Sequence, residues 1–566
     1  MVQEINVNSS SINGVINYKE ILIDSSNKYK DKVAFYEKKG RGKISHSYKE
    51  LKNDVFRLGT MLLEIGLKDK HIAIIGENNY NWIISYLAVI NGVGVAVPLD
   101  KELSEEQLCR LMEKSDVSVL IFSKTFLSSI EYIKEKVPDL QCCICIDENS
   151  YGYDDVKSLI DKGKEMLDKG NTLYLKSNVN IDSLNVIMFT SGTTGTNKGV
   201  MISQRNILSN VMDMAEIFQG YDNLLAVLPF HHAYENICGI LTTIKLGITT
   251  FINDSLKYLS KNINEFKPEA MILVPLFLET MYRSVEVELK RKKLEGTFKK
   301  YLKVSNALLK INIDLRRKIF KKLIDNFGGN LKTIISGGAL LREDLIKKFK
   351  DIGINVINGF GITECTPVVS INFSENLNSI GKPLSSVDIS ILNPDENGVG
   401  EILVHGDHVM LGYYKDDKST KESFVNDWFK TGDLGYIDDS GYLYITGRKK
   451  NLIVLSNGKN VNPEELEEYI LENMSYVKET LVYSANSRNG SKIIVGAVYI
   501  GKEYISMRGI ENVRNQLEED LRKINNKLPL FKQIQKIYIK EEEFEKNTSK
   551  KIVRSKFLEE GNKIGI

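Results

Sequence analysis

The segment from Phe189 to Gly199 holds the densest gathering of potential anion-binding groups in this sequence. It reads Phe-Thr-Ser-Gly-Thr-Thr-Gly-Thr-Asn-Lys-Gly and follows a β-branched run, so we expect a strand that leads into a glycine-rich loop. The glycines let backbone N–H groups turn inward around an anion, while the hydroxyls add donors and the lysine adds a compact positive charge. The P-loop spacing is not met, because Asn197 stands where the second glycine would be. We therefore predict a polyphosphate loop of another kind, with ligands at Thr190, Ser191, Gly192, Thr193, Thr194, Gly195 and Lys198.

Four shorter segments further along the chain combine glycine with polar or charged residues. They are Ser336–Leu340 (Ser-Gly-Gly-Ala-Leu), Asn358–Glu364 (Asn-Gly-Phe-Gly-Ile-Thr-Glu), Thr431–Asp433 (Thr-Gly-Asp) and Gly447–Lys450 (Gly-Arg-Lys-Lys). Together with the loop, and in this order, they resemble the adenylate-forming superfamily of acyl-CoA synthetases, peptide-synthetase adenylation domains and luciferases. The resemblance spans about Tyr18 to Arg554. Any one of these motifs alone would be weak, whereas several in order are highly specific.

The resemblance implies that the protein uses ATP and Mg²⁺ to activate a carboxylic acid as acyl-AMP, releasing pyrophosphate, and then transfers the acyl group to the thiol of CoA. This chemistry needs a metal ion and fixed cationic donors, because charge spreads over the phosphoryl oxygens in the transition state. By the resemblance, Glu364 binds Mg²⁺ and Thr363 contacts an α-phosphate oxygen. The resemblance implies further ATP contacts. Residues Gly337, Gly338 and Ala339 form a wall for the adenine, and the segment of Asn358, Gly359 and Phe360 stacks its aromatic ring on the base. Asp433 and Arg448 contact the ribose or phosphate.

The segment Leu228–Glu235 carries two adjacent histidines. By the resemblance, His232 lies near the acyl carbonyl and the path by which the thiol enters. A metal site at His231 and His232 is disfavoured, because successive residues of a strand face opposite ways and no Cys or Asp stands at ligand spacing. Glu235 occupies a position where many family members have glycine. This form, like the segment Asn451–Val461, resembles long-chain fatty-acyl-CoA synthetases, so we expect a medium- or long-chain fatty acid as substrate.

The resemblance also implies a C-terminal domain that turns between two orientations. The hinge is implied at Lys450, and Lys551 is implied to reach the adenylation site in one orientation. In the other, the strand at Gly458 faces the site and leaves room for pantetheine. The family usually has glycine before the lysine that matches Lys551, and this chain has Lys550, which stiffens the loop and could share its charge.

These residues must be positioned by a large layered fold. Helical stretches alternate with short β-branched runs from Tyr48 to about Thr333–Ile335, a pattern typical of parallel α/β sheets. Short strands with Gly and Asp turns follow, including Gly400–His405 and Gly441–Ile445. We therefore predict an α/β protein with a large N-terminal region of layered α/β subdomains, a small antiparallel β subdomain, and a small mobile α+β C-terminal domain. The expected bounds are 1–449 for the adenylation core, about 380–447 for its β-rich subdomain, and 450–566 for the C-terminal domain, which opens with a helix that Asn462 caps and Pro463 starts.

Composition narrows the class of protein further. The 566 residues include 76 Lys+Arg against 74 Asp+Glu, a net charge of +2, which argues against a nucleic-acid binder. The N-terminus lacks the pattern of a secretory signal, and only 6 Cys occur, so we expect a cytoplasmic protein.

Two further segments could be read as binding sites. We expect buried thiols rather than a zinc site at Cys142-Cys143-Ile144-Cys145. Segment 290–322 has a net charge of +11 with interleaved apolar residues. This pattern favours a basic face exposed to solvent. The alternative is weak peripheral contact with an anionic membrane.

Three alternatives to a fatty-acid–CoA ligase stay open at this point. The acyl group could pass to the phosphopantetheine of an acyl carrier protein instead of CoA. The enzyme could activate an amino acid, with Glu235 as the acid that binds the substrate amine. A non-catalytic nucleotide-binding or scaffold protein would require lost site residues, yet the phosphate-loop lysine and the implied metal, ribose and C-terminal residues all remain.

Overall fold

The computed structural model describes residues 17–40, 42–148, 152–190, 197–339, 341–373, 376–455, 459–486, 492–546, 552–554 and 556–558. The chain divides into two compact units. The larger unit spans Asn6–Asp388 and Val404–Phe429, and the smaller contains Ile389–Leu403 and Lys430–Ile566. The predicted β-rich segment 380–447 therefore contributes to both units, and the domain boundary between 449 and 450 stays a prediction.

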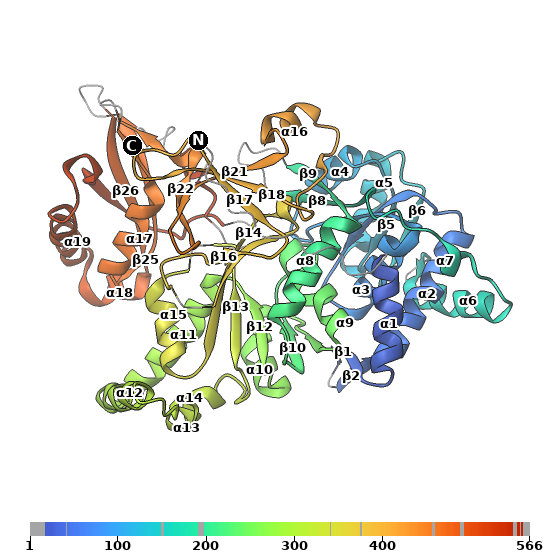
Figure 1. Ribbon diagram of the computed structural model, residues 1–566, viewed down its shortest axis with the longest axis horizontal. Coiled ribbons are helices and arrows are strands. Elements are labelled where there is room, and N and C mark those ends of the chain that lie inside the picture. The colour runs from blue at the N-terminus through green and yellow to red at the C-terminus, as the bar shows by residue number, and fades with distance from the viewer. Residues whose placement is uncertain are drawn as a thin grey trace. The chain divides into compact units, whose positions relative to one another are not determined.

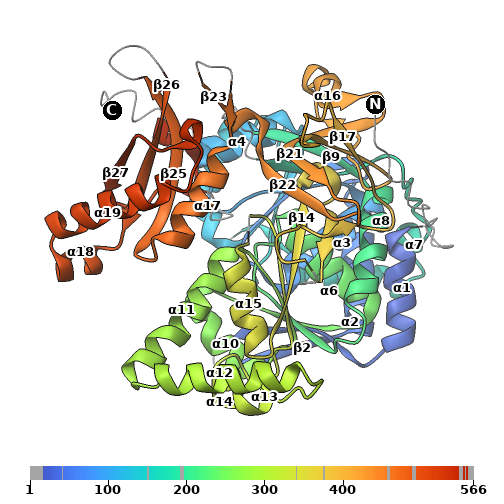
Figure 2. The same ribbon diagram turned by 60° about the vertical axis from the view of Figure 1, so that its left-hand side comes forward.

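A nine-stranded sheet forms one layer of the larger unit (Figure 1). Its central strands run parallel, with antiparallel strands at its two edges. Helices α10 (Leu259–Phe266), α11 (Pro275–Arg291) and α15 (Glu343–Asp351) share a buried apolar cluster with it (Figure 2). In spatial order the strands are β16 (Lys382–Pro383), β15 (Val368–Asn372), β14 (Asn355–Gly361), β13 (Thr333–Ser336), β12 (Ala270–Leu273), β10 (Asn223–Ala226), β11 (Thr249–Ile252), β1 (Val33–Lys39) and β2 (Gly42–Ser47).

A second, eight-stranded sheet carries the predicted phosphate loop. Its strand β5 reads Val-Ser-Val-Leu-Ile-Phe and is buried throughout, as expected of a parallel strand covered on both faces. Helices α4 (Glu105–Lys114) and α5 (Ile130–Lys136) pack against it. In spatial order the strands are β19 (Gly412–Tyr413), β9 (Lys198–Ser203), β8 (Leu184–Thr190), β4 (Gly94–Pro98), β3 (Lys70–Ile75), β5 (Val117–Phe122), β6 (Cys142–Cys145) and β7 (Asp154–Asp155).

Helix starts in the larger unit follow from local sequence. Ser47 precedes α2 (Tyr48–Glu64), and its hydroxyl accepts a hydrogen bond from the Glu50 N–H. The Glu50 carboxylate in turn accepts a hydrogen bond from the Ser47 N–H. Ser203 and Asn206 make the same reciprocal capping box at the start of α8 (Gln204–Ile217). Each box satisfies N–H groups that have no partner inside the helix.

The smaller unit contains both helices and sheets. Strands β17 (Asp388–Leu392), β18 (Gly400–His405), β21 (Trp428–Ile437) and β22 (Leu443–Arg448) lie in one sheet, in which β21 and β22 run antiparallel. Helices α17 (Pro463–Asn473) and α19 (Ile510–Asn525) then pack on a three-stranded sheet of β25 (Val477–Asn486), β26 (Lys492–Ile500) and β27 (Lys536–Lys540). Pro463 starts α17 as predicted, but the expected cap is wrong, because the Asn462 side chain makes no capping hydrogen bond and packs beside Gly447.

Candidate functional site

The predicted phosphate loop is a hairpin connection whose two ends are fixed. Thr190, the last residue of β8, is the register partner of Lys198, the first residue of β9. Lys114 donates a hydrogen bond of 2.7 Å to the Asn197 carbonyl at the base of the loop. The predicted ligands Ser191, Gly192, Thr193, Thr194 and Gly195 lie outside the described residues.

One tyrosine connects the lysine of this loop with the predicted metal ligand. The Tyr413 hydroxyl donates a hydrogen bond of 2.9 Å to Oε1 of Glu364, and Nζ of Lys198 lies 4.5 Å from the centre of the Tyr413 ring. Burial, and secondarily the nearby Glu364 carboxylate, raises the pKa of Tyr413, so this hydroxyl stays protonated and acts as a donor. The structure thus brings together two predicted site residues that are more than 160 positions apart in sequence.

Strand β19 fixes this arrangement through main-chain hydrogen bonds. Tyr413 pairs with Val200 of β9 in antiparallel register, and the Leu411 N–H donates to the Met201 carbonyl. The Met410 N–H donates 2.9 Å to the carbonyl of Glu364, which lies in the short helix Thr363–Cys365. The metal-ligand segment and the phosphate-loop strand are therefore held by one intervening strand.

The predicted adenine wall and the predicted stacking strand lie side by side. Parallel strands β13 and β14 pair Ser336 with Asn358, so residues 337–339 and 359–361 emerge at the same carboxyl edge of the nine-stranded sheet. A side-chain carbon added to Gly337 would lie 3.1 Å from the Gly359 carbonyl oxygen and 3.2 Å from the Tyr234 ring. Gly337 is buried, Gly338 and Ala339 are exposed, and Phe360 is 9% exposed. The close packing explains why position 337 carries no side chain.

The histidine pair follows β10 at this same carboxyl edge, in a turn. The sequence-based expectation that His231 and His232 lie on a strand and face opposite ways is wrong. Their ring centroids are 4.4 Å apart, and Nε2 of His231 lies 3.6 Å from Oδ2 of Asp100. Burial lowers the pKa of His231 well below its ordinary value, so this ring is neutral. Within the described ranges, no three His, Cys, Asp or Glu side chains gather as metal ligands.

Three side chains hold this turn in place. Asn78 donates 2.8 Å to the Leu228 carbonyl and accepts 3.0 Å from the Phe230 N–H. Asn236 donates 3.1 Å to the Phe230 carbonyl. Glu235 Oε2 accepts 2.9 Å from the Leu228 N–H. The position of His232 is therefore set by residues both near it and distant in sequence.

Glu235 itself is fully buried. It lies in the π-helix Tyr234–Leu241, and a side-chain carbon added at Gly239 would lie 2.2 Å from its Oε1 atom. Burial raises the pKa of Glu235 to about 8. The backbone hydrogen bonds from Leu228 and Val227 lower the pKa, but by less than burial raises it. The side chain is therefore a neutral carboxylic acid at neutral pH.

The predicted ribose ligands lie in the smaller unit and pair with each other. Asp433 on β21 and Arg448 on β22 are register partners, and Nε of Arg448 lies 2.8 Å from Oδ1 of Asp433. Asp433 is 2% exposed, and its N–H donates 3.0 Å to the Thr431 hydroxyl. The cross-strand pair compensates a buried carboxylate and fixes its orientation.

The predicted hinge residue, Lys450, lies two positions after Arg448 in the sequence. Lys450 lies in the short helix Lys449–Asn451, after the end of β22. Desolvation, and then the nearby Arg448 and Arg554, lowers the pKa of Lys450 to about 8. The preceding Lys449 instead pairs with the buried Glu401 at 2.7 Å. The two lysines of this pair thus stand in different electrostatic surroundings.

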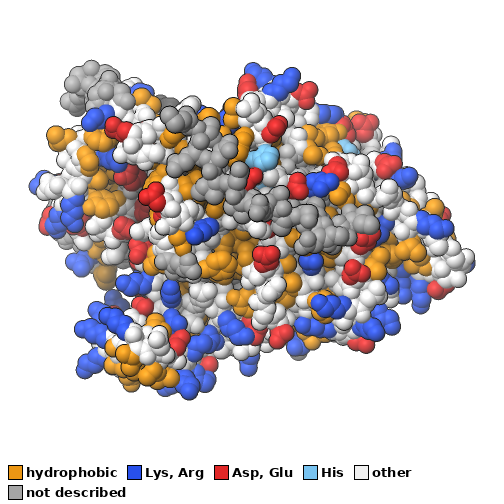
Figure 3. All heavy atoms as spheres, viewed as in Figure 1, with side chains coloured by type: hydrophobic (Ala, Val, Ile, Leu, Met, Phe, Trp, Pro, Cys, Tyr) orange, Lys and Arg blue, Asp and Glu red, His pale blue; other side chains and the backbone are white. Residues whose placement is uncertain are grey.

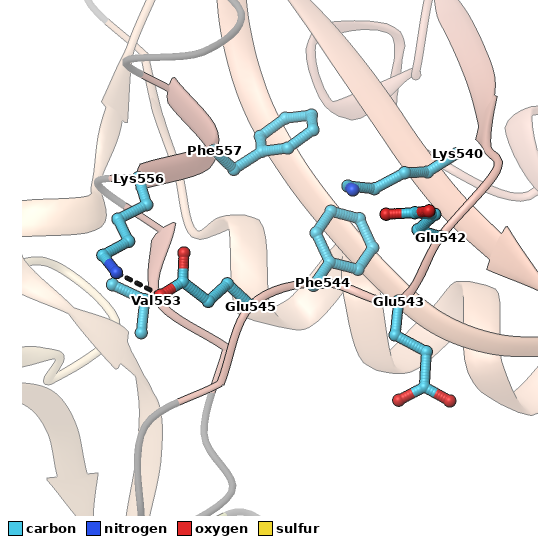
Figure 4. Close-up of a pocket in the computed structure, with 8 residues that line it drawn as sticks. All are labelled: Lys540, Glu542, Glu543, Phe544, Glu545, Val553, Lys556 and Phe557. Carbon is cyan, nitrogen blue, oxygen red and sulfur yellow. Dashed lines mark hydrogen bonds and ion pairs between the residues drawn. The ribbon is translucent and has the colours of Figure 1, made fainter. Parts of the chain in front are cut away.

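Lys551 and Gly458 lie outside the described residues. The structure does describe residues before and after Lys551 in the sequence, among them Glu545 and Val553 (Figure 4). Lys546 and Ile552 form an antiparallel bridge, and the Val553 N–H donates 2.8 Å to the Glu545 carbonyl. Arg554 then donates 2.9 Å to the Val482 carbonyl and pairs with Glu467. The described residues on either side of 547–551 are therefore paired with each other, and Arg554 is anchored to the C-terminal sheet.

Figure 4 also shows a small pocket beside these residues. The Phe544 and Phe557 rings contact each other edge to face, with centroids 5.3 Å apart, and Lys556 pairs with Glu545. The pocket measures about 300 Å³ and is lined by Lys540, Glu542, Glu543, Phe544, Glu545, Val553, Lys556 and Phe557. None of these residues belongs to the predicted site.

Sequence reasoning missed Tyr413, Tyr234 and Asn78. Tyr413 has a weak local signal, since it lies in a Leu-Gly-Tyr-Tyr run between β-rich segments. Asn78 lies in an ordinary Glu-Asn-Asn-Tyr turn, and its two hydrogen bonds to the histidine turn cross 150 residues of chain or more. No local pattern indicates such a contact.

Comparison with known proteins decides the family. The model for AMP-binding enzymes matches residues 22–414, and the model for the AMP-binding enzyme C-terminal domain matches residues 450–563. The chain belongs to the AMP-binding enzyme family. The predicted membership of the adenylate-forming superfamily and the predicted fold class are thereby confirmed. This AMP-binding enzyme is an adenylate-forming acid ligase.

Two curated relatives and one solved structure show what this AMP-binding enzyme resembles. It is 27% identical to the long-chain-fatty-acid–[acyl-carrier-protein] ligase AEE15, chloroplastic, of Arabidopsis thaliana, over 89% of this chain and 79% of that protein. It is 29% identical to long-chain-fatty-acid–CoA ligase 5 of Rattus norvegicus, over 88% and 79%. The o-succinylbenzoate CoA synthetase of Bacillus subtilis, solved with ATP and a magnesium ion, shares the fold with a TM-score of 0.71, 22% identity and coverage of 94% and 98%.

Proposed function

We propose that this protein activates a medium- or long-chain fatty acid with ATP and transfers the acyl group to CoA. The names of the Arabidopsis and rat relatives, both ligases of long-chain fatty acids, support this substrate class. The single observation that carries the activation step is the link from Lys198 through Tyr413 to Glu364. It places a cation over the ring and a carboxylate at the hydroxyl of one tyrosine, which suits the handling of a triphosphate and its metal.

The proposed reaction has two balanced steps. A carboxylate oxygen of the fatty acid attacks the α-phosphorus of ATP, the bond to the β-phosphate oxygen breaks, and pyrophosphate leaves. The CoA thiol, having lost its proton, then attacks the acyl carbon of the acyl-AMP, and AMP leaves. The first step supplies the second with a leaving group of low basicity.

The residues around Glu364 fit Mg²⁺. Its carboxylate is partly exposed, and the Thr363 hydroxyl is adjacent in the same short helix. These are hard oxygen ligands of the kind Mg²⁺ takes in phosphate-handling sites. When bound, Mg²⁺ would neutralise phosphate charge. Tyr413 would orient the carboxylate, and Lys198 would add a second positive charge.

The surroundings of Glu235 support a fatty acid over an amino acid as substrate. A residue that recognises a substrate amine needs an ionised carboxylate that the amine can reach. Glu235 is instead fully buried, protonated at neutral pH and hydrogen-bonded to the Leu228 N–H. We therefore assign it to the turn that carries His232, beside the proposed path of the acyl group and the thiol.

We further propose that the C-terminal domain serves the two steps in turn. Lys551 would reach the adenylation site for the first step, and rotation at Lys450 would bring the strand of Gly458 to the site for the second. The bridge between Lys546 and Ile552 and the pairing of Arg554 with Glu467 support the proposal that Lys551 moves with its domain. Asp433 and Arg448 would hold the ribose and the phosphate.

A pyrophosphate-release assay over free fatty acids of graded chain length tests this function. We expect release with medium or long chains, and release only with amino acids would overturn the substrate class. Lys551→Ala should abolish acyl-AMP formation and spare thioester formation from supplied acyl-AMP, whereas Lys550→Ala, its matched neighbour, should retain most of both. Equal loss of both steps in Lys551→Ala would contradict the two-orientation scheme.

The acyl acceptor has a second candidate, because the Arabidopsis relative is named as a ligase to acyl carrier protein. The same radiolabelled acid offered with free CoA or with holo acyl carrier protein separates the two. We expect label in CoA. Label confined to the carrier protein would assign the acceptor to that protein and leave the activation step unchanged.

A further inference from the structure

The segment that joins α11 to β13 forms a group of short helices at one end of the larger unit. Helices α12 (Glu295–Leu309), α13 (Arg316–Ile319) and α14 (Lys321–Asp325) lie together in both ribbon views (Figures 1 and 2). The basic run 290–322 that the sequence singled out begins in the last turn of α11 and continues through this segment, and none of the residues of the proposed reaction lies in it.

Helix α12 has two apolar faces, and only one of them is used by the fold. On the inner face, Phe298 and Leu302 pack against the core of the larger unit, with the Phe298 ring 5.5 Å from that of Phe320. Ser305 on the same side is 1% exposed. The inner face therefore accounts for the attachment of α12 to the fold.

The second apolar face points away from the core. Tyr301, Val304 and Leu308 recur at intervals of three and four residues, which places them along one side of the helix, and Ile311 follows in the turn after α12 ends at Leu309. Tyr301, Val304 and Ile311 are 52%, 54% and 64% exposed. We call these four residues the outer stripe. Six of the nineteen large exposed hydrophobic residues found among the described positions fall between Val287 and Ile313, so the apolar exposure is concentrated here.

The basic residues around the outer stripe are only partly neutralised. Lys292 pairs with Glu288, Arg316 with Asp314, and Lys321 with Asp325. Arg317 donates to the carbonyls of Leu331, Gly353 and Gly329. These four residues therefore have partners within the fold. Nine others form no ion pair among the described residues, namely Lys290, Arg291, Lys293, Lys299, Lys300, Lys303, Lys310, Lys318 and Lys322.

The space-filling view shows this combination directly. Over α12 to α14, apolar side chains form a patch that is bordered by lysines and arginines (Figure 3). On α12 the exposed Lys300 and Lys303 flank the outer stripe. Long lysine side chains beside an exposed apolar stripe suit a bilayer interface, because the chain can lie along apolar groups while the ammonium reaches a phosphate.

We propose that the outer stripe of α12 and the unpaired lysines around it dock the protein on an anionic lipid bilayer. Charge complementarity favours this occupant, since the patch carries a large excess of positive charge. The stripe would insert to headgroup depth, and the lysines would contact lipid phosphates. This inference does not rest on the proposed reaction, because it uses no residue of that site.

Vesicle co-sedimentation with the full chain tests the proposal. The vesicles are phosphatidylcholine alone and phosphatidylcholine mixed with phosphatidylglycerol. We expect binding that requires the anionic lipid and weakens as salt concentration rises. Lys300→Gln combined with Lys303→Gln should lower the partition coefficient about 25-fold, since each lysine near the surface is worth about fivefold. Lys164→Gln with Lys169→Gln, which removes the same charge at the exposed end of α6 (Val156–Asp168), should change it little.

A second pair of variants tests the apolar part. Val304→Ser combined with Ile311→Ser should lower the partition coefficient by about tenfold, because exposed apolar area can no longer enter the interface. Both side chains are more than half exposed, so folding should be unaffected, as circular dichroism would check. Equal binding to both vesicles, full retention by the serine variant, or equal loss by the α6 variant would each overturn the proposal. A dimer in sedimentation velocity that Val304→Ser dissolves would do so too, because a second copy would then cover the stripe.

Discussion

The Tyr413 hydroxyl donates a hydrogen bond of 2.9 Å to Oε1 of Glu364. Tyr413 lies on β19 and Glu364 in the helix that follows β14, so the contact joins the two sheets of the larger unit. It restrains the carboxylate that we propose as the magnesium ligand. The same ring faces the ammonium of Lys198.

Tyr413→Phe should therefore impair acyl-AMP formation more than protein stability. A hydrogen bond to a charged group is worth about 1.5–3 kcal/mol, so kcat/KM for pyrophosphate release should fall about 10- to 100-fold. The loss should shrink at high magnesium concentration if the carboxylate is merely less well oriented. Tyr414→Phe is the matched control, since the Tyr414 hydroxyl donates to Asp116 and the same atom is removed next door. Similar losses in both variants would argue against a role for Tyr413 at the metal ligand.

Glu235 gives a prediction about the pH dependence of stability. Its pKa is raised to about 8 in the folded protein, whereas a carboxyl in an unfolded chain titrates near ~4.3. Between these values the folded state keeps a proton that the unfolded state has lost. The free energy of unfolding should therefore fall as pH rises through this window, by at most about 1.4 kcal/mol per pH unit from this group.

Glu235→Gln should remove that contribution. The amide oxygen can still accept from the Leu228 N–H, but the side chain does not titrate. The difference in melting temperature, variant minus wild type, should therefore increase steadily from about pH 5 to about pH 8. Glu216→Gln on the exposed side of α8 serves as the control. A difference between variant and wild type that is constant with pH would show that Glu235 is ionised throughout.

The pair of Asp433 and Arg448 predicts unequal costs for its two partners. Arg448→Gln takes the cation away from a carboxylate that is 2% exposed, whereas Asp433→Asn leaves an arginine that reaches solvent. Urea denaturation should therefore show a larger loss for Arg448→Gln, by about 1–3 kcal/mol, since an uncompensated buried charge is the costlier defect. In the Asp433→Asn background, Arg448→Gln should cost little. Additive losses in the double variant would mean that the two side chains do not interact.

Much of the fold could be predicted because it depends on local sequence. Gly400–His405 was predicted as a strand and is β18, and the run Val117–Ile121 lies within β5. Alternating helices and β-branched runs indicated parallel sheets, since the period and the turn residues are properties of neighbouring positions. Thr190 and Lys198 stand at the ends of adjacent strands, as a glycine-rich loop between them predicts.

Other predictions failed where local sequence was overridden. His231 and His232 were expected on a strand, but β10 ends at Ala226 and Asn78 holds the following turn from 150 residues away. The cationic Arg317 was counted with the exposed basic run, yet it donates hydrogen bonds to three main-chain carbonyls. Asn462 has the sequence of a cap without its hydrogen bond.

The sequence alone determined which chemical groups are available: a glycine- and hydroxyl-rich segment with its lysine, a carboxylate beside a hydroxyl, and the order of motifs that identifies the family. The tertiary structure decided which of these groups meet. Tyr413 reaches Glu364 because β19 pairs with β9, and Glu235 keeps its proton because the π-helix Tyr234–Leu241 buries it. Strand pairing and burial are set by contacts between distant segments, and a linear pattern of residue types carries no record of those contacts.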